Sequence, residues 1–165
     1  MNLKLRPWLE TDLDALVEHI NDPGIAKFMT DQFPYPCDAE KARSFIANAN
    51  KHTPQRIFAI ALNGEAAGAI GIHPKEDIDR KNAELGYWLG KEFWGKGIIT
   101  AAIKQMVEYG FKNFDIARIY ARPFHTNIAS QKALEKAGFK LEARFEKTIF
   151  KDGEFLDELI YAVRK

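Results

Sequence analysis

The stretch from Gly86 to Ile103 limits the folds open to this chain more than any other segment. It reads GYWLGKEFWGKGIITAAI, an apolar aromatic segment followed by a glycine-containing loop and an alanine-rich amphipathic segment. That order predicts a strand, a loop and then a helix from about Ile98 to Phe111. A loop that leads into a helix N-terminus is a common phosphate site, because backbone N–H groups and the helix dipole point to one place.

The segments on either side predict a mostly antiparallel sheet. Strands are expected at residues 3–8, 56–62, 66–74, 81–89, 117–123, 139–150 and 155–165, and further helices at 11–22, 37–50 and 127–138, with 24–36 as a connecting segment. Asn63-Gly64 and Asp152-Gly153 each predict a hairpin turn. The three strands from 56 to 89 form an antiparallel meander before the long helix, which has to cross to the next strand. We predict an α+β fold, with a mixed, mostly antiparallel central sheet flanked by helices, and one domain over residues 1–165.

Single residues predict where the helices begin and end. Thr11 is expected to cap the helix over 11–22, and Asp38 the helix over 37–50, because their side chains can accept a hydrogen bond from a first-turn N–H group. Gly138 is expected to end the helix over 127–138, since glycine adopts the left-handed conformation that such ends need.

Composition excludes several classes of protein. A single cysteine, Cys37, excludes a disulfide framework and a cysteine-ligated zinc site. The formal net charge of +1 argues against a nucleic-acid partner. The N-terminal residues MNLKLRPWLE contain no apolar leader, and no segment reaches the length of a membrane span. We therefore expect a cytoplasmic protein with no membrane partner.

Two nucleotide-binding patterns compete for the glycine loop. Residues 90–96 read GKEFWGK and fit the start of a Walker loop, but Gly97 stands where magnesium binding needs serine or threonine. A dinucleotide fingerprint needs three glycines, and Gly95, Gly97 and Thr100 provide two. The loop can still bind a phosphate through exposed backbone N–H groups, with Lys96 adding charge. The alternative is a tight strand-to-helix turn that binds nothing.

Two motifs resemble those of a known superfamily. Gly86–Leu89, Trp94–Ile98 and Thr100 resemble the acetyl-CoA-binding motif of the GNAT N-acetyltransferases, (Gln/Arg)-x-x-Gly-x-(Gly/Ala). Asn127–Ser130 and Leu134–Phe139 resemble the second motif of the same superfamily. Both motifs lie in the right order, and the whole chain fits. AELGYWL, WGKG, NIAS and KAGF together are most similar to the RimJ/RimL-like branch, which contains ribosomal-protein N-terminal alanine and serine acetyltransferases.

The sequence departs from the family pattern at two positions. Glu92 stands where the general pattern has Gln or Arg. Leu134 stands where many members have a tyrosine that protonates the leaving thiolate, so the general acid is left open. Neither position removes the glycine loop that the cofactor requires.

The resemblance implies an enzyme with the GNAT acyl-CoA N-acyltransferase fold. It would transfer the acetyl group of acetyl-CoA directly to a primary amine, without a metal. A protein N-terminal α-amine, such as that of a ribosomal protein, is the expected acceptor. The alternatives are a small-molecule amine (a polyamine, an amino acid or a drug) and a non-catalytic acyl-CoA-binding module. A monomer and a homodimer both remain open.

The same resemblance implies which residues contact acetyl-CoA. The pyrophosphate would lie on the N–H groups of residues 94–100, and the pantetheine arm would pair with the Tyr87–Leu89 strand where it splays from residues 117–123. Asn127 would hydrogen-bond the arm, although it would also serve simply as a helix cap. The full set is Tyr87, Trp88, Leu89, Trp94, Gly95, Lys96, Gly97, Ile98, Thr100, Asn127 and Ser130.

The chemistry needs a base, an oxyanion donor and an acid. A protein α-amine has a pKa near 7.7–8.0, so a weak base acting through water is enough. Glu84, on the strand before the glycine loop, is the first candidate base and His73 the second, while Ser130 is the candidate proton donor; each of them would otherwise be only structural. His73 at a strand end, and Phe33 and Tyr35 in the connecting segment, are expected to join Glu84 in binding the acceptor; the alternative for Phe33 and Tyr35 is that they only pack over the sheet.

Overall fold

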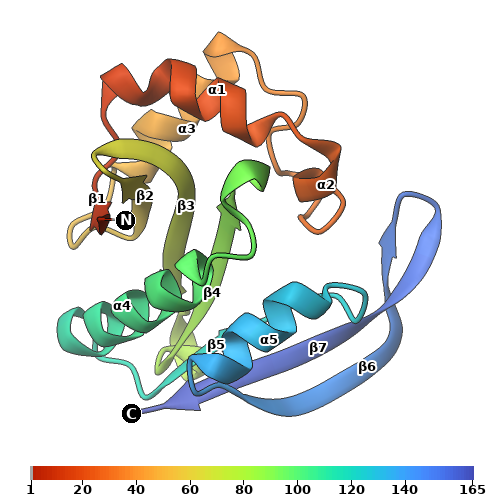
Figure 1. Ribbon diagram of the computed structural model, residues 1–165. Coiled ribbons are helices and arrows are strands. Elements are labelled where there is room, and N and C mark those ends of the chain that lie inside the picture. Colours follow the sequence, from red (N-terminus) through yellow and green to blue (C-terminus); the bar gives the residue numbers. More distant parts are fainter. Residues whose placement is uncertain (1) are drawn as a thin grey trace. The chain divides into compact units, whose positions relative to one another are not determined.

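The computed structural model describes residues 2–165 (Figure 1). Its helices and strands are, in chain order, β1 (Leu3–Arg6), α1 (Leu13–Ile20), α2 (Pro23–Ala26), α3 (Ala39–Ala49), β2 (Ile57–Leu62), β3 (Glu65–Pro74), β4 (Asn82–Leu89), α4 (Ile98–Asn113), β5 (Arg118–Ala121), α5 (Ile128–Lys136), β6 (Lys140–Lys151) and β7 (Glu154–Arg164). Short 3₁₀ turns lie at η1 (Glu10–Asp12), η2 (Asp77–Asp79) and η3 (Lys91–Phe93). Every predicted strand and helix is confirmed, whereas α2 lies in the segment that was expected only to connect.

The strands form one mixed sheet in the order β1-β2-β3-β4-β5-β7-β6. β1–β2, β2–β3, β5–β7 and β6–β7 pair antiparallel, while β4 and β5 pair parallel. The helix α4 makes the connection between the two parallel strands, as their direction requires. The predicted α+β fold with a mostly antiparallel sheet is therefore confirmed.

The chain divides into two compact units, which we describe separately. Unit 1 contains the described residues up to Gly71 together with Tyr87–Ile98, and unit 2 contains Ile72–Gly86 and Ile99–Lys165. The core of unit 1 is built from one face of each helix and of the strands beside them; its buried members include Trp8, Leu16, Ile20, Ala42, Ile46, Ala49, Ala59 and Trp88. Leu16 and Ile20 belong to the apolar stripe that predicted α1.

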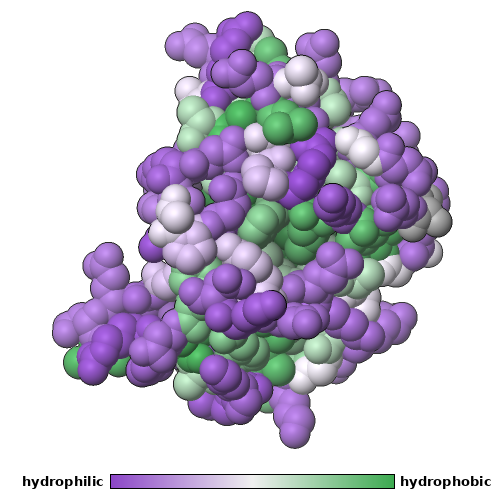
Figure 2. All heavy atoms as spheres, turned by 90° about the vertical axis from the view of Figure 1, so that its left-hand side faces the viewer, coloured by the Kyte–Doolittle hydropathy of each residue, from purple (hydrophilic) through white to green (hydrophobic). Residues whose placement is uncertain are grey.

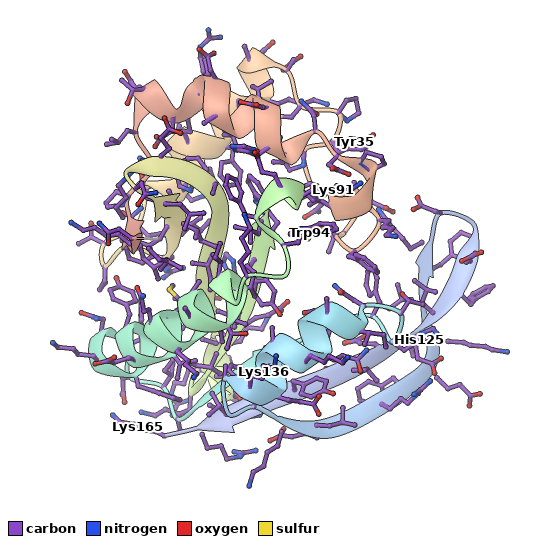
Figure 3. The ribbon with its side chains drawn as sticks, viewed as in Figure 1. Tyr35, Lys91, Trp94, His125, Lys136 and Lys165 are labelled. Atoms are coloured by element: carbon purple, nitrogen blue, oxygen red, sulfur yellow. The ribbon has the colours of Figure 1, made fainter. Side chains whose placement is uncertain are left out.

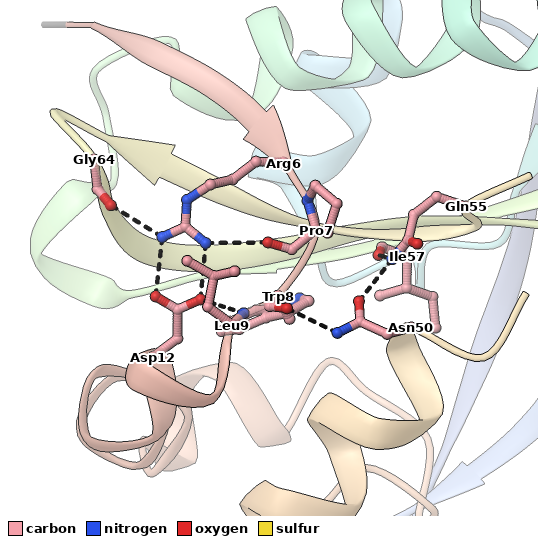
Figure 4. Close-up of polar contacts among 9 residues, drawn as sticks. All are labelled: Arg6, Pro7, Trp8, Leu9, Asp12, Asn50, Gln55, Ile57 and Gly64. Carbon is pink, nitrogen blue, oxygen red and sulfur yellow. Dashed lines mark hydrogen bonds and ion pairs between the residues drawn. The ribbon is translucent and has the colours of Figure 1, made fainter.

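An ion pair in unit 1 fixes the chain between β1 and α1 (Figure 4). Arg6 donates two hydrogen bonds to the Asp12 carboxylate, at 2.8 and 2.9 Å, and Asp12 also accepts one from the Leu9 N–H group at 2.8 Å. Burial raises the pKa of Asp12, but the hydrogen bonds from Arg6 and Leu9 and the Arg6 charge lower it by more, so it lies below its usual value. The prediction that Thr11 caps α1 is wrong, because Asp12 occupies the N-cap position and no side chain caps that end.

Unit 2 holds α4 very close to the sheet. A Cβ atom built on Gly110 would lie 2.5 Å from Cδ1 of Ile72 and 3.1 Å from Cδ1 of Ile119, so a larger residue there would require these side chains to shift. In the same unit, α5 ends as predicted at Gly138, which has a φ of +94°. The Gly138 and Phe139 N–H groups donate to the carbonyl oxygens of Glu135 and Leu134. This arrangement is a Schellman motif.

The surface is mainly polar on the face that Figure 2 shows, with hydrophobic residues in smaller areas between hydrophilic ones. Among residues 2–165, no helix combines the length and apolar character needed to cross a membrane.

Candidate functional site

The glycine loop of unit 1 has the backbone conformation of an anion site. Gly95 and Gly97 each have a φ of +74°, and a Cβ built on either would meet no atom within 4 Å. Glycine is therefore needed here for its conformation and not for space. Gly95, Lys96 and Gly97 are all exposed, so a ligand can reach their N–H groups. The chain then enters α4, whose first N–H groups have no acceptor within the helix.

Trp94 anchors this loop within unit 1 (Figure 3). Its indole Nε1–H donates to the carbonyl oxygen of Leu89 at 2.8 Å. Its ring also lies against α2, since a Cβ built on Gly24 would be 3.5 Å from Cη2 of Trp94. The end of β4 and the start of the loop are thus joined by a side chain as well as by η3. The sequence motif includes Trp94 but gives no sign of this bond.

His19 supports the other side of the same turn. Its Nδ1 atom lies 3.1 Å from Oε1 of Glu92, and its ring packs edge-on against Phe93 with centroids 5.3 Å apart. A Cβ built on Gly90 would lie 3.1 Å from that Nδ1 atom. Glu92, which departs from the family pattern, thus pairs with a histidine of α1. No sequence signal linked His19 to the loop, because the contact joins residues far apart in the chain.

The strand residues before the loop are also in unit 1. Trp88 and Leu89 are buried, and Trp88 packs edge-on against Phe33 with ring centroids 6.2 Å apart. Phe33 is half-buried, whereas Tyr35, in the same segment between α2 and α3, is 40% exposed (Figure 3). One candidate acceptor-binding residue, Phe33, therefore packs with its ring against Trp88 of the candidate cofactor strand.

Glu84 lies in unit 2, among charges that sequence reasoning did not identify. Its carboxylate is 3.8 Å from Lys75 Nζ and 4.0 Å from Arg122 Nη1, and its side chain is 29% exposed. Arg122 in turn donates from Nε to Glu158 at 2.6 Å, and this hydrogen bond raises the pKa of Arg122. Glu84 is thus a partly exposed carboxylate between two cations. Its neighbours come from the ends of β3 and β5, so they follow from strand pairing and not from any local motif.

The other residues of unit 2 that the sequence singled out lie in or beside α4, α5 and β3. Oδ1 of Asn127 accepts a hydrogen bond from the Ser130 N–H group at 3.2 Å, so Asn127 does cap α5, and its amide Nδ2 can still donate. Ser130 is half-buried in the first turn of α5. His73 is exposed near the end of β3, and Thr100 is half-buried in α4. Leu134 is fully buried, so its position in α5 is a packing position.

The chemistry available to these groups is binding and proton transfer. The loop of unit 1 offers N–H donors and the Lys96 charge to an anion, which fits a pyrophosphate. Over the described residues, the parallel pairing of β4 with β5 covers three pairs, from Asn82–Arg118 to Glu84–Tyr120, although β4 has eight residues. No group of three or more His, Cys, Asp or Glu residues within 2–165 is placed to hold a metal ion.

Comparison with known proteins points to one family. The family described as Acetyltransferase (GNAT) domain matches residues 2–140. The chain is 34% identical over 106 residues to YdaF of Bacillus subtilis, which is named as a candidate ribosomal N-acetyltransferase; the match spans 64% of this chain and 57% of YdaF. It is 30% identical over 168 residues to the N-acetyltransferase p20 of Bacillus licheniformis, spanning 99% of this chain and 93% of p20.

The same fold occurs among solved structures. One of them is RimL, a ribosomal-protein α-N-acetyltransferase in complex with coenzyme A. It matches with a TM-score of 0.86 and 24% identity, over 99% of this chain and 94% of RimL. At that identity the likeness establishes the architecture of the chain, and the choice of acceptor has to be argued from its own residues.

Proposed function

This chain belongs to the acetyltransferase (GNAT) family, and from that premise we propose that its acceptor is the α-amine of a protein N-terminus, such as that of a ribosomal protein. The chain is an acetyl-CoA-dependent N-acetyltransferase, so the acceptor is an amine. The name of its relative YdaF supports a ribosomal-protein acceptor.

The observation that carries the proposal is the charge balance around Glu84. Lys75 and Arg122 lie within 4.0 Å of this carboxylate, and Arg122 also pairs with Glu158. Two cations thus balance two carboxylates, which leaves no excess negative charge for a polyamine with several ammonium groups. A single amine that binds in its neutral form needs no such excess.

Glu84 is the general base that removes the proton from the acceptor amine. An α-amine has a pKa of about 7.7–8.0, so a substantial fraction is neutral near pH 7.5 and a carboxylate acting through a water is a sufficient base. A lysine side chain, with a pKa of about 10.4, would need a much stronger base. The neutral α-amine is therefore the acceptor that best matches a carboxylate base.

Cofactor binding is assigned to the glycine loop and β4. Acetyl-CoA supplies the acetyl thioester that is transferred. The N–H groups of residues 94–100 and the Lys96 charge hold its pyrophosphate, the Tyr87–Leu89 backbone holds its arm, and the Asn127 amide donates to that arm. A backbone N–H of β4 stabilises the carbonyl oxygen as it gains charge. Ser130 gives the proton that the sulfur takes up on leaving.

The acceptor side and the organisation of the chain complete the proposal. Phe33 and Tyr35 line the path of the acceptor, with His73 as a further contact.

Residues 1–165 form one domain, and the protein works in the cytoplasm. The family match over residues 2–140 supports the single domain, since it includes residues of both compact units.

The test is a panel of acceptors assayed by release of free thiol from acetyl-CoA. The panel contains tripeptides beginning with Ser, Ala or Met, the same peptides with a blocked N-terminus and one lysine, and spermidine. We expect kcat/KM to be at least about tenfold higher for the free N-terminal peptides, because only their amine has a substantial neutral fraction at the assay pH. Higher kcat/KM for spermidine or for the blocked lysine peptide would contradict the proposal. Thiol release without any added amine would also contradict it.

A further inference from the structure

Among the residues that the structure describes, the indole N–H group of Trp88 is a buried donor without a partner. Trp88 is 6% exposed, and within residues 2–165 its Nε1 atom has no hydrogen-bond acceptor. Buried N–H groups in native proteins are nearly always paired with protein, water or ligand, because an unpaired one has lost its bond to water. The Trp88 donor can therefore bond an acceptor on a ligand, since residues 2–165 supply none.

The position of Trp88 indicates where that acceptor comes from. Its backbone belongs to the Tyr87–Leu89 strand, and its ring meets the edge of Phe33. Phe33 is half-buried and is held by turn hydrogen bonds, from its own N–H to the Thr30 carbonyl and from the Tyr35 N–H to the Phe33 carbonyl. A half-buried aromatic ring on the segment between α2 and α3 thus packs against the indole that carries the buried donor.

We propose that Trp88 determines acceptor specificity: its Nε1–H donates a hydrogen bond to the carbonyl oxygen that lies next to the α-amine of a peptide acceptor, once the Phe33 ring has moved aside. This inference rests on the proposed function. A peptide N-terminus carries a carbonyl on the same carbon as its amine, whereas an alkylamine or polyamine carries no oxygen acceptor. A site with a buried donor rejects ligands that leave it unpaired.

Trp8 provides a matched control within the same unit. It is 2% exposed, its Nε1 atom is also buried without a partner among the described residues, and it packs edge-on against Phe45 at 5.5 Å. It precedes η1, and its carbonyl oxygen accepts a hydrogen bond from Asn50 (Figure 4). A defect that comes only from changing a buried indole should appear equally in both tryptophans.

The first experiment compares W88F with W8F, each of which keeps an aromatic ring and removes the N–H group. The measured quantity is the ratio of kcat/KM for the tripeptide Ala-Ala-Ala to that for propylamine. We expect W88F to lower this ratio roughly 3- to 10-fold, the effect of one hydrogen bond, and W8F to leave it within about twofold. An unchanged ratio in W88F overturns the inference while leaving the proposed function intact. Failure of the unaltered enzyme to acetylate any peptide overturns both.

The second experiment uses the unaltered protein, so its result can be interpreted even if W88F does not fold. The chain has three tryptophans, and their indole ¹⁵N–¹H resonances are separately observable. With coenzyme A present, addition of the tripeptide should move the Trp88 indole resonance downfield and leave that of Trp8 in place. Propylamine should move neither. A Trp88 resonance that stays unmoved at saturating tripeptide overturns the inference.

Discussion

The indole Nε1–H of Trp94 donates a hydrogen bond to the carbonyl oxygen of Leu89 at 2.8 Å. This bond joins the last residue of β4 to the first residue of the glycine loop, so the two segments assigned to acetyl-CoA hold each other in place. A loop that is ordered before binding gives up less conformational entropy when the ligand arrives.

Replacing Trp94 by phenylalanine tests this ordering. W94F keeps an aromatic ring and removes the N–H donor, so we expect the Kd for acetyl-CoA to rise roughly 3- to 10-fold. Isothermal titration calorimetry measures the change, with W8F as the control that should bind as the unaltered protein does. An unchanged Kd in W94F would show that the bond does not order the loop.

Comparing alanine variants at Gly95 and Gly64 separates an effect on stability from an effect on cofactor binding. Both have positive φ values, +74° and +90°, and a Cβ on either would meet nothing within 4 Å. Alanine at either site should therefore cost about 1 kcal/mol of unfolding free energy through backbone strain alone. Only G95A should also weaken acetyl-CoA binding, since Gly64 lies in the β2–β3 turn. Equal affinity in the two variants, measured by calorimetry alongside urea unfolding, would remove the loop from the cofactor site.

Glu84 has a close structural match in Glu142. The side chain of Glu142 is 30% exposed and pairs with Arg118 and Arg164, much as Glu84, at 29%, lies between Lys75 and Arg122. We expect E84Q to lower kcat for a peptide acceptor about 100-fold, the typical value of a general base. The Kd for acetyl-CoA should stay the same, and E142Q should keep kcat within about twofold. A loss of less than about threefold in E84Q would mean that Glu84 is not the base.

The pair of Arg6 and Asp12 makes a prediction about acid stability. Because the pKa of Asp12 is lower in the folded chain than its usual value, its ionised form stabilises the fold above about pH 4, and this contribution is lost as the pH falls through the folded pKa. D12N should therefore lose about 2 kcal/mol of unfolding free energy at pH 7, and less at pH 3. Urea unfolding at the two pH values measures the difference. A constant gap between D12N and the unaltered protein would contradict this account.

Local sequence signals were sufficient for the strands and helices. Alternating and 3.6-residue apolar patterns predicted each long element. As expected, Asp38 caps the start of α3 by accepting a hydrogen bond from the Lys41 N–H group, and Gly138 follows the end of α5. Two predictions were wrong. The cap of α1 was misplaced because of an ion pair, and α2 was missed because it is short. Asp12 replaced Thr11 at the start of α1 because Arg6 fixes its carboxylate. α2 has four residues and begins at Pro23, too few for a periodic pattern.

The sequence predicted only those parts of the candidate site that neighbouring residues in the chain form. Gly95 and Gly97 were identified from their own motif, and their positive φ values follow from it. The cations beside Glu84 and the His19–Glu92 pair depend on residues that meet through folding. The same is true of the burial of the Trp88 donor, which has no acceptor among residues 2–165. One sequence without its fold contains no signal for such contacts, so the charge balance that favours an α-amine emerged only from the structure.

The position of the transferred acetyl group on a defined peptide tests the central claim most directly. The acceptor is a peptide with a free N-terminal serine and one internal lysine, incubated with acetyl-CoA and the enzyme and sequenced by tandem mass spectrometry. The account predicts acetylation of the N-terminal amine, absent with E84Q at matched times. Acetylation of the lysine side chain, or none on either amine under conditions where spermidine is acetylated, would contradict it.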